Sequence, residues 1–100
     1  MGTPLAETEQ RLDIWLWRAR FFKMRADAAK AVSQKGVRID RTGMIRKSQK
    51  PGATVCEGDI LTFRARGQVL TVRVLGLPLR RGPAAEAQGF YESVSEESEG

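Results

Sequence analysis

The chain has 100 residues, a formal net charge of +5, a 41% hydrophobic fraction, one cysteine and no histidine. This length corresponds to one domain with a modest core, because such a chain buries only about 60–65% of its unfolded surface. The longest apolar run, Ile14-Trp15-Leu16-Trp17, is far shorter than the roughly 18 residues of a membrane-spanning helix. A lone Cys56 without histidine excludes an internal disulfide, a Cys–His nucleophile pair and the usual zinc-ligand sets.

The charges are distributed unevenly along the chain. All 17 lysines and arginines lie between Arg11 and Arg81, together with only five acidic residues, so this stretch carries a charge of +12. Five glutamates and no basic residue follow Pro83. A body of this charge attracts polyanions and accelerates their capture. The imbalance therefore favours a nucleic-acid-binding protein over one with an ordinary solvated surface.

Two helices are predicted near the start, after a flexible leader over residues 1–10. From Arg11 to Phe22, apolar residues recur at steps of three and four, which indicates an amphipathic helix. A second helix is predicted over Arg25–Lys35, where Gly36 suits a left-handed C-terminal cap. Because about two residues separate these helices, we expect a tight helical hairpin.

After the hairpin, the spacing of apolar residues changes to two, which is typical of strands. Turn residues separate the apolar segments, with Glu57-Gly58-Asp59 as one example. The predicted strands cover Val37–Asp40, 44–46, Thr54–Val55, Ile60–Phe63 and Val69–Val74.

The C-terminal part is predicted to leave the sheet. Pro83 suits the first turn of a short helix over 84–91, and residues 93–100 have the acidic, serine-rich composition of a disordered tail. Residues 11–75 then form the binding domain, and residues 76–92 form a C-terminal extension. The order of elements predicts an α+β fold, with the helical hairpin packed on a small, mainly antiparallel sheet.

Basic residues crowd the helical hairpin and the first two strands. The arginine side chain presents a planar fork of donors that matches phosphate oxygens. The free N–H groups at the start of the second helix would add a phosphate site beside Lys23 and Arg25. We predict RNA contacts from Arg11, Arg18, Arg20, Lys23, Arg25, Lys30, Lys35, Arg38, Arg46, Lys47 and Lys50. The sequence leaves contacts from Arg64, Arg66 and Arg73 open.

The aromatic residues of the first helix fall into two groups. Trp15 and Phe22 share its apolar face and are predicted to lie in the core. Trp17 and Phe21 lie on another side and are candidates for contacts with a base or with the C-terminal tail. For Trp17, packing under the C-terminal segment is an equal alternative.

No catalytic motif is present in the sequence. It contains no phosphate-binding glycine loop and no nucleophile elbow, and its few carboxylates have structural explanations. Asp13, for example, lies in the first turn of a helix, where it interacts favourably with the helix dipole. We therefore predict a non-catalytic protein without a cofactor or metal site.

Several short motifs occur in order along residues 11–63. They are Arg11-Leu12-Asp13, Lys23-Met24-Arg25-Ala26, Ala28, Gly36-Val37 and Glu57-Gly58-Asp59-Ile60. In this order and spacing they resemble the S4-type RNA-binding domain, or αL motif. The likeness narrows to the small ribosome-associated heat-shock protein family of bacteria, over residues 11–92, through Arg11–Trp17, Ala19-Arg20-Phe21, 80–87 and Tyr91-Glu92.

This resemblance implies a cytoplasmic protein that binds ribosomal RNA or tRNA. Its target would be the free large ribosomal subunit with a stalled nascent chain, whose recycling it aids after heat stress. Met24 and Ala29 depart from the family, which usually has serine or threonine and an arginine at these positions. The residues alone leave two alternatives open: a DNA-binding protein that uses the hairpin, and an accessory RNA-binding subunit of a separate enzyme. We expect a monomer with no membrane partner.

Overall fold

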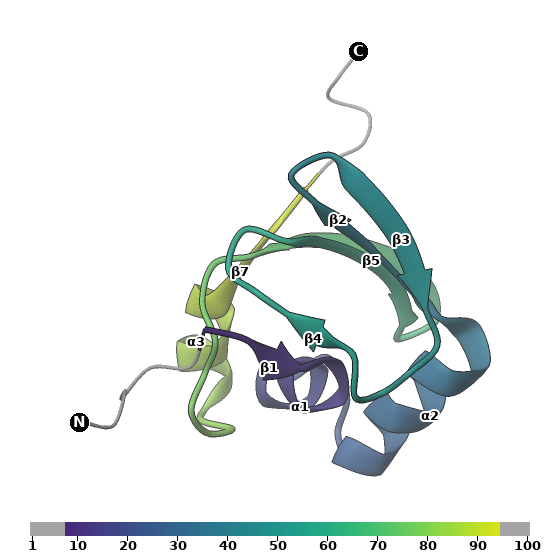
Figure 1. The fold of residues 1–100 in the computed structure, drawn as a ribbon. Helices are drawn as coiled ribbons and strands as arrows, with labels where there is room; N and C mark the ends of the chain where they lie inside the picture. Colours follow the sequence, from purple (N-terminus) through teal and green to yellow (C-terminus); the bar gives the residue numbers. More distant parts are fainter. Residues whose placement is uncertain (1–7, 95–100) are drawn as a thin grey trace, which may run out of the picture.

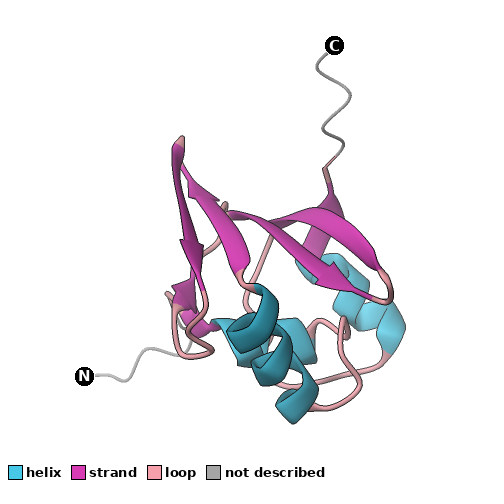
Figure 2. Ribbon diagram, turned by 90° about the vertical axis from the view of Figure 1, so that its right-hand side faces the viewer, coloured by secondary structure: helices cyan, strands magenta, loops and turns pink. Residues whose placement is uncertain are grey.

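The computed structural model describes residues 8–94, and its helices lie on one side of a curved antiparallel sheet (Figures 1 and 2). The helices are α1 (Leu12–Arg18), α2 (Arg25–Lys35) and α3 (Ala84–Ala87), with a 3₁₀ helix, η1 (Gln88–Phe90), directly after α3. The strands are β1 (Gln10–Arg11), β2 (Val37–Arg41), β3 (Met44–Ser48), β4 (Thr54–Val55), β5 (Ile60–Ala65), β6 (Gln68–Val74) and β7 (Tyr91–Ser93). Within residues 8–94, no helix is long and apolar enough to cross a membrane.

The main sheet has the strand order β3-β2-β5-β6-β7, and every neighbouring pair is antiparallel. Arg38 lies opposite Lys47 on one neighbouring strand and opposite Thr62 on the other. The short strands β1 and β4 pair separately beside α1. The predicted α+β class, with a helical hairpin on a mainly antiparallel sheet, is confirmed.

The first helix ends earlier than predicted. It stops at Arg18, and Arg20 has a φ of +70°, in the left-handed region, which turns the chain out of the helix. The N–H of Phe21 then donates to the carbonyl of Leu16 at 3.0 Å. The predicted extension to Phe22 is therefore wrong, and residues 19–24 connect the helices in place of a two-residue turn. The predicted bounds of α2 are confirmed.

The core lies between the two long helices and the inner face of the sheet. Alternating residues of β2, β5 and β6 are buried there, together with the apolar face of α1. The Phe21 side chain is only 4% exposed, and its ring centroid lies 5.0 Å from that of Phe63 and 4.5 Å from that of Tyr91. The prediction that Phe21 contacts a base is therefore wrong. Phe22 is half-buried against the same core.

The C-terminal segment returns to the sheet. The predicted helix over 84–91 is divided into α3 and η1, and Tyr91–Ser93 continues as strand β7 against β6. A three-residue strand is too short to show an alternating pattern, which explains why the sequence did not predict it. Gln10 of the predicted leader is buried in β1, and Ser93 of the predicted tail lies in β7. The predictions for residues 1–7 and 95–100 lie outside the described residues.

Candidate nucleic-acid interface

Asp13 holds two arginines at the start of the helical hairpin. Its side chain is 3% exposed, and its carboxylate accepts two hydrogen bonds from Arg11, Nε to Oδ1 at 3.0 Å and Nη2 to Oδ2 at 3.0 Å. Nε of Arg25 lies 3.7 Å from Oδ2 of the same carboxylate. The hydrogen bonds that Arg11 donates to Asp13, together with the negative charge of this carboxylate, raise the pKa of Arg11 above its ordinary value.

Both guanidinium groups remain accessible to a ligand. The side chains of Arg11 and Arg25 are 47% and 49% exposed, so most of their ten N–H donors do not bond to Asp13. One carboxylate between two guanidinium groups leaves a net positive charge. The arrangement therefore presents arginine donors in fixed positions, which is what phosphate recognition requires.

The loop after β3 brings a third basic residue to this surface. The N–H of Leu12 donates to the carbonyl of Ala53 at 2.7 Å, and the N–H of Asp13 donates to the carbonyl of Pro51 at 3.1 Å. The guanidinium group of Arg11 lies beside Gly52. Lys50 is exposed in this loop, and we call Arg11, Asp13, Arg25 and Lys50 the Asp13-centred surface.

The start of α2 is open to solvent next to this surface. Met24, its N-cap residue, provides no side-chain hydrogen bond, and residues 23–27 are exposed. The first N–H groups of a helix carry a partial positive charge and have no partner within the helix. They therefore add to the positive potential beside Lys23 and Arg25.

Two predicted contact residues bind the C-terminal segment instead of facing only solvent. Nη1 of Arg18 donates to the carbonyl of Pro78 at 2.9 Å, and Nε of Arg20 donates to the carbonyl of Gly82 at 2.6 Å. Both side chains are half-buried. These arginines hold the C-terminal segment against α1, and fewer of their donors remain for a ligand.

Trp17 packs under this same segment, which was the predicted alternative to a contact with a base. The guanidinium carbon of Arg81 lies 5.8 Å from the centroid of a Trp17 ring. Arg81 also donates from Nε to the carbonyl of Trp17 at 3.1 Å and from Nη2 to that of Phe22 at 3.3 Å. This ring is therefore covered by a neighbouring residue on one face.

The remaining predicted residues lie on α2 and on the first strands of the sheet. All of them are exposed: Lys23, Lys30, Lys35, Arg38, Arg46 and Lys47. Arg46, Lys47 and Lys50 line a depression of about 480 Å³ beside the loop that follows β3. The predicted residues thus form more than one surface: Arg11 and Arg25 contact Asp13, whereas Lys50, in the neighbouring loop, lines a depression with Arg46 and Lys47.

The contact between Asp13 and the two arginines was not predicted from the sequence. In the sequence, the favourable interaction of Asp13 with the helix dipole was enough to explain an aspartate in the first turn of a helix. The available signal was the spacing of two between Arg11 and Asp13, which lets one side chain reach back to the other across the start of α1.

The other buried carboxylate has a structural function. Asp59 is 1% exposed, and its oxygens accept hydrogen bonds from Nε and Nη2 of Arg41, both at 2.9 Å, and from the N–H of Cys56 at 2.8 Å. All of these contacts fix the turn between β4 and β5. Among the described residues, no group of three or more potential ligands has metal-binding geometry.

Comparison with known proteins identifies the family. The model of the S4 domain matches residues 10–61. Heat shock protein 15 of Escherichia coli (strain K12) is 37% identical over 91 residues, which cover 91% of this chain and 65% of that protein. The heat shock protein 15 homolog of Aeromonas salmonicida is 35% identical over 95 residues, which cover 94% of this chain and 68% of that protein.

A solved structure agrees with these matches. The trimeric structure of Vibrio cholerae heat shock protein 15 has a TM-score of 0.75 and 32% sequence identity, and the match covers 91% of this chain and 87% of that chain. The chain spans 65% of the length of its E. coli relative. Together, the fold, the S4 match and these relatives show that the chain belongs to the S4-domain family of heat shock protein 15.

Proposed function

We propose that this protein is a non-catalytic RNA-binding protein that recognises phosphate groups of structured RNA. The observation that carries the proposal is the buried carboxylate of Asp13, which holds Arg11 and Arg25 while both guanidinium groups remain half exposed. Structured RNA is read largely by its shape and phosphates, because its deep groove hides the base edges. Positioned arginines on a basic, S4-type fold suit this kind of recognition.

We further propose that the RNA is ribosomal RNA or tRNA on the free large ribosomal subunit in the cytoplasm. In this proposal, the protein binds subunits that carry a stalled nascent chain and aids their recycling after heat stress. The S4 match and the heat-shock names of the relatives support it. The chain itself contributes RNA contacts and no chemical step.

The first test measures the affinity for a labelled structured RNA hairpin as a function of salt concentration. If about six to eight phosphates are neutralised, log K should fall against log salt with a slope of about −4 to −7. Substituting Arg11→Gln and Arg25→Gln together should weaken binding by roughly tenfold or more. A slope near zero for the unaltered chain would contradict the proposal.

A matched control separates site-specific contacts from net charge. Arg73 and Arg80 form ion pairs with Glu92 and Glu86 away from Asp13, so Arg73→Gln with Arg80→Gln removes the same formal charge. This control should lose less than about threefold in affinity. Equal losses in the two variants would show that only net charge matters. Duplex DNA at the same salt concentration should compete less well than structured RNA, and equal competition would favour the DNA alternative.

Gradient sedimentation of extracts after heat shock tests the proposed partner. We expect the protein to travel with free large subunits, and sedimentation with small subunits or with neither would contradict this proposal. Copurification of one stoichiometric enzyme would favour the accessory-subunit alternative. The expected monomer stays a prediction, and because the Vibrio cholerae relative was solved as a trimer, sedimentation equilibrium of the pure chain provides the direct measurement.

A further inference from the structure

A groove of basic residues runs along α2 and onto the outer face of the sheet. One depression of about 370 Å³ lies between α2 and the β5–β6 turn, and a second of about 510 Å³ lies over β2, β3 and β5. The two depressions share Gln34, Lys35 and Arg64, so they adjoin, and we describe them together as one groove. We define the basic groove by five of its cations, which are Lys30, Lys35, Arg38, Lys47 and Arg64. A sixth, Arg66, also lines it but donates from Nη2 to the carbonyl of Arg20 at 2.6 Å, so it is not counted with them.

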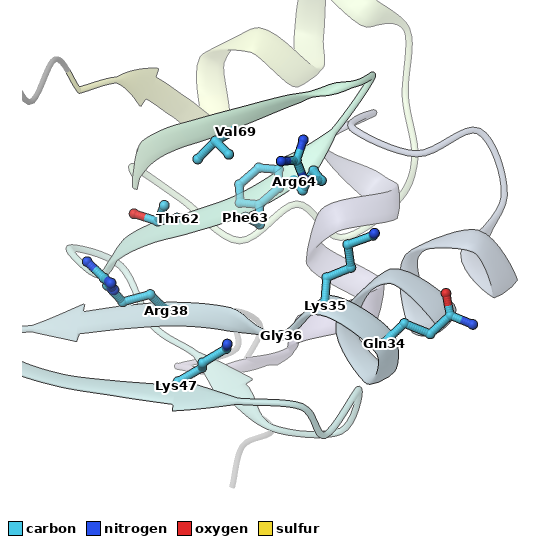
Figure 3. Close-up of a pocket in the computed structure, with 9 residues that line it drawn as sticks. All are labelled: Gln34, Lys35, Gly36, Arg38, Lys47, Thr62, Phe63, Arg64 and Val69. Atoms are coloured by element: carbon cyan, nitrogen blue, oxygen red, sulfur yellow. The ribbon is translucent and has the colours of Figure 1, made fainter.

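The strand register explains why these cations share one face. Arg38 pairs with Lys47 on one side and with Thr62 on the other, so these three side chains project to the same side of the sheet. Arg64 is two residues beyond Thr62 on β5 and therefore projects the same way. Lys35 reaches this face from the last turn of α2, and Figure 3 shows these residues around one depression.

The lack of a side chain at Gly36 leaves room for one of these cations, Lys47. The side chain of Lys47 crosses the bare Cα of Gly36, where an added Cβ would lie 2.6 Å from Cε of the lysine. The absence of a side chain at Gly36 thus provides the space in which the lysine stem lies. The Lys47 ammonium group is in this way directed along the same face as Arg38 and Lys35 (Figure 3).

The groove is positively charged and lacks carboxylate partners for its cations. Among the ion pairs of the described residues, none involves the five cations that define the groove, whereas Arg11, Arg25, Arg41, Arg73 and Arg80 each lie within 4.0 Å of a carboxylate. One acidic residue, Asp27, lines the groove at its α2 end. Neighbouring like charges repel one another, and an anionic ligand relieves that repulsion.

The chemistry of the lining indicates which part of a nucleic acid it suits. Phe63 is 4% exposed, so it offers no free ring on which a base can stack, and Phe22, at the α2 side, is half-buried against the core. The exposed side chains over the sheet are cations and Val69. Such a surface contacts phosphate oxygens and not base edges.

We propose that the basic groove is a further binding surface for the phosphate backbone of RNA, with Lys35 and Arg64 at its centre, near the end of α2 that lies away from Arg25 and Asp13. Arg25 and Lys35 begin and end this 11-residue helix, so they lie about 15 Å apart along its axis. The proposal rests on the proposed RNA-binding function. It assigns Arg64 to binding together with Lys35, Arg38 and Lys47. Lys47 also lines the depression beside the loop after β3 that contains Lys50, so the two surfaces adjoin there.

The test compares two variants that lose the same charge. Lys35→Gln with Arg64→Gln alters two exposed groove residues, and Arg73→Gln with Arg80→Gln is the control. With a labelled RNA hairpin at about 0.1 M salt, the groove variant should bind roughly tenfold more weakly, and its salt slope should be shallower by about 2. The control should change by less than about threefold. Lys35→Arg with Arg64→Lys retains both charges and should bind within about threefold of the unaltered chain.

The RNA affinities of the unaltered chain and of the two site variants distinguish failure of the groove from failure of the proposed RNA-binding function. If the unaltered chain shows no salt-dependent RNA binding, both fail. If Arg11→Gln with Arg25→Gln weakens binding while the groove variant does not, only the groove is excluded as a site. Equal losses in the groove and control variants would also overturn the groove. If both sites act, their losses in log K should add in the combined variant, as expected for distant sites, and thermal unfolding should be unchanged in the groove variant.

Discussion

Arg11 and Asp13 form a two-point contact across the start of α1, in which Nε and Nη2 of the arginine each donate to a carboxylate oxygen at 3.0 Å. The two partners differ in exposure, because the Asp13 side chain is 3% exposed and that of Arg11 is 47% exposed. The buried partner fixes the position, and the exposed partner remains available to a ligand. In the proposed function, Asp13 therefore acts on binding through Arg11 and Arg25 as a positioning residue.

Replacing this carboxylate tests its positioning effect. Asp13→Asn keeps the size of the side chain and raises the net charge of the protein by one unit. Simple electrostatic attraction would then tighten RNA binding, whereas loss of the anchor for both guanidinium groups should weaken it severalfold. We expect weaker binding in fluorescence anisotropy at fixed salt, with only a small loss of unfolding free energy, because the lost hydrogen bonds come from solvent-exposed arginines. Tighter binding would contradict the positioning effect.

Local patterns predicted most elements of the fold. The bounds of α2 and the places of β2 to β6 followed from apolar spacing, from Gly36 and from turn residues, which act within a few positions of the chain. The early end of α1 and the position of Phe21 depend on contacts with Phe63 and Tyr91, far along the sequence. No local pattern contains that information.

The candidate site was predictable from charge and resemblance, but its division into separate surfaces was not. Arg18 and Arg20 looked like other hairpin arginines in the sequence, yet they donate to carbonyl groups 60 and 62 residues away. Arg64 remained open because only the pairing of β5 with β2 places it near Lys35 and Arg38. Charge counting finds the cations, and tertiary contacts decide which of them are free.

Phe21 should affect stability and not RNA binding. Its ring contacts Trp15, Phe63 and Tyr91 in the core, so Phe21→Leu should lower the unfolding free energy by about 1–2 kcal/mol through lost aromatic packing. Urea unfolding measures this change. RNA affinity, measured well below the melting temperature, should stay within about twofold. A fivefold loss of affinity by the folded variant would restore the prediction that this ring contacts a base.

The Arg41–Asp59 pair should contribute more to stability than the exposed pair of Arg73 and Glu92. Asp59→Asn weakens three hydrogen bonds at a buried side chain, and we expect a loss of about 2–3 kcal/mol, reduced because the Arg41 side chain is 42% exposed. Arg73→Gln breaks a pair whose side chains are 43% and 49% exposed, so it should cost less than about 1 kcal/mol. Urea unfolding of both variants tests the order, and an equal effect would contradict it.

Gly36 should be required both for the backbone between α2 and β2 and for the position of Lys47. Its φ of +80° and ψ of 163° lie in a region that side-chain-bearing residues avoid, so Gly36→Ala should cost about 1–3 kcal/mol. The added Cβ would lie 2.6 Å from Cε of Lys47, which is too close for both atoms to stay in place. The flexible Lys47 side chain would therefore be displaced. A double-mutant cycle with Lys47→Ala separates the two effects. The backbone cost should persist without the lysine, whereas the reduction in RNA affinity caused by Gly36→Ala should disappear, and an unchanged reduction would show that Gly36 does not act through Lys47.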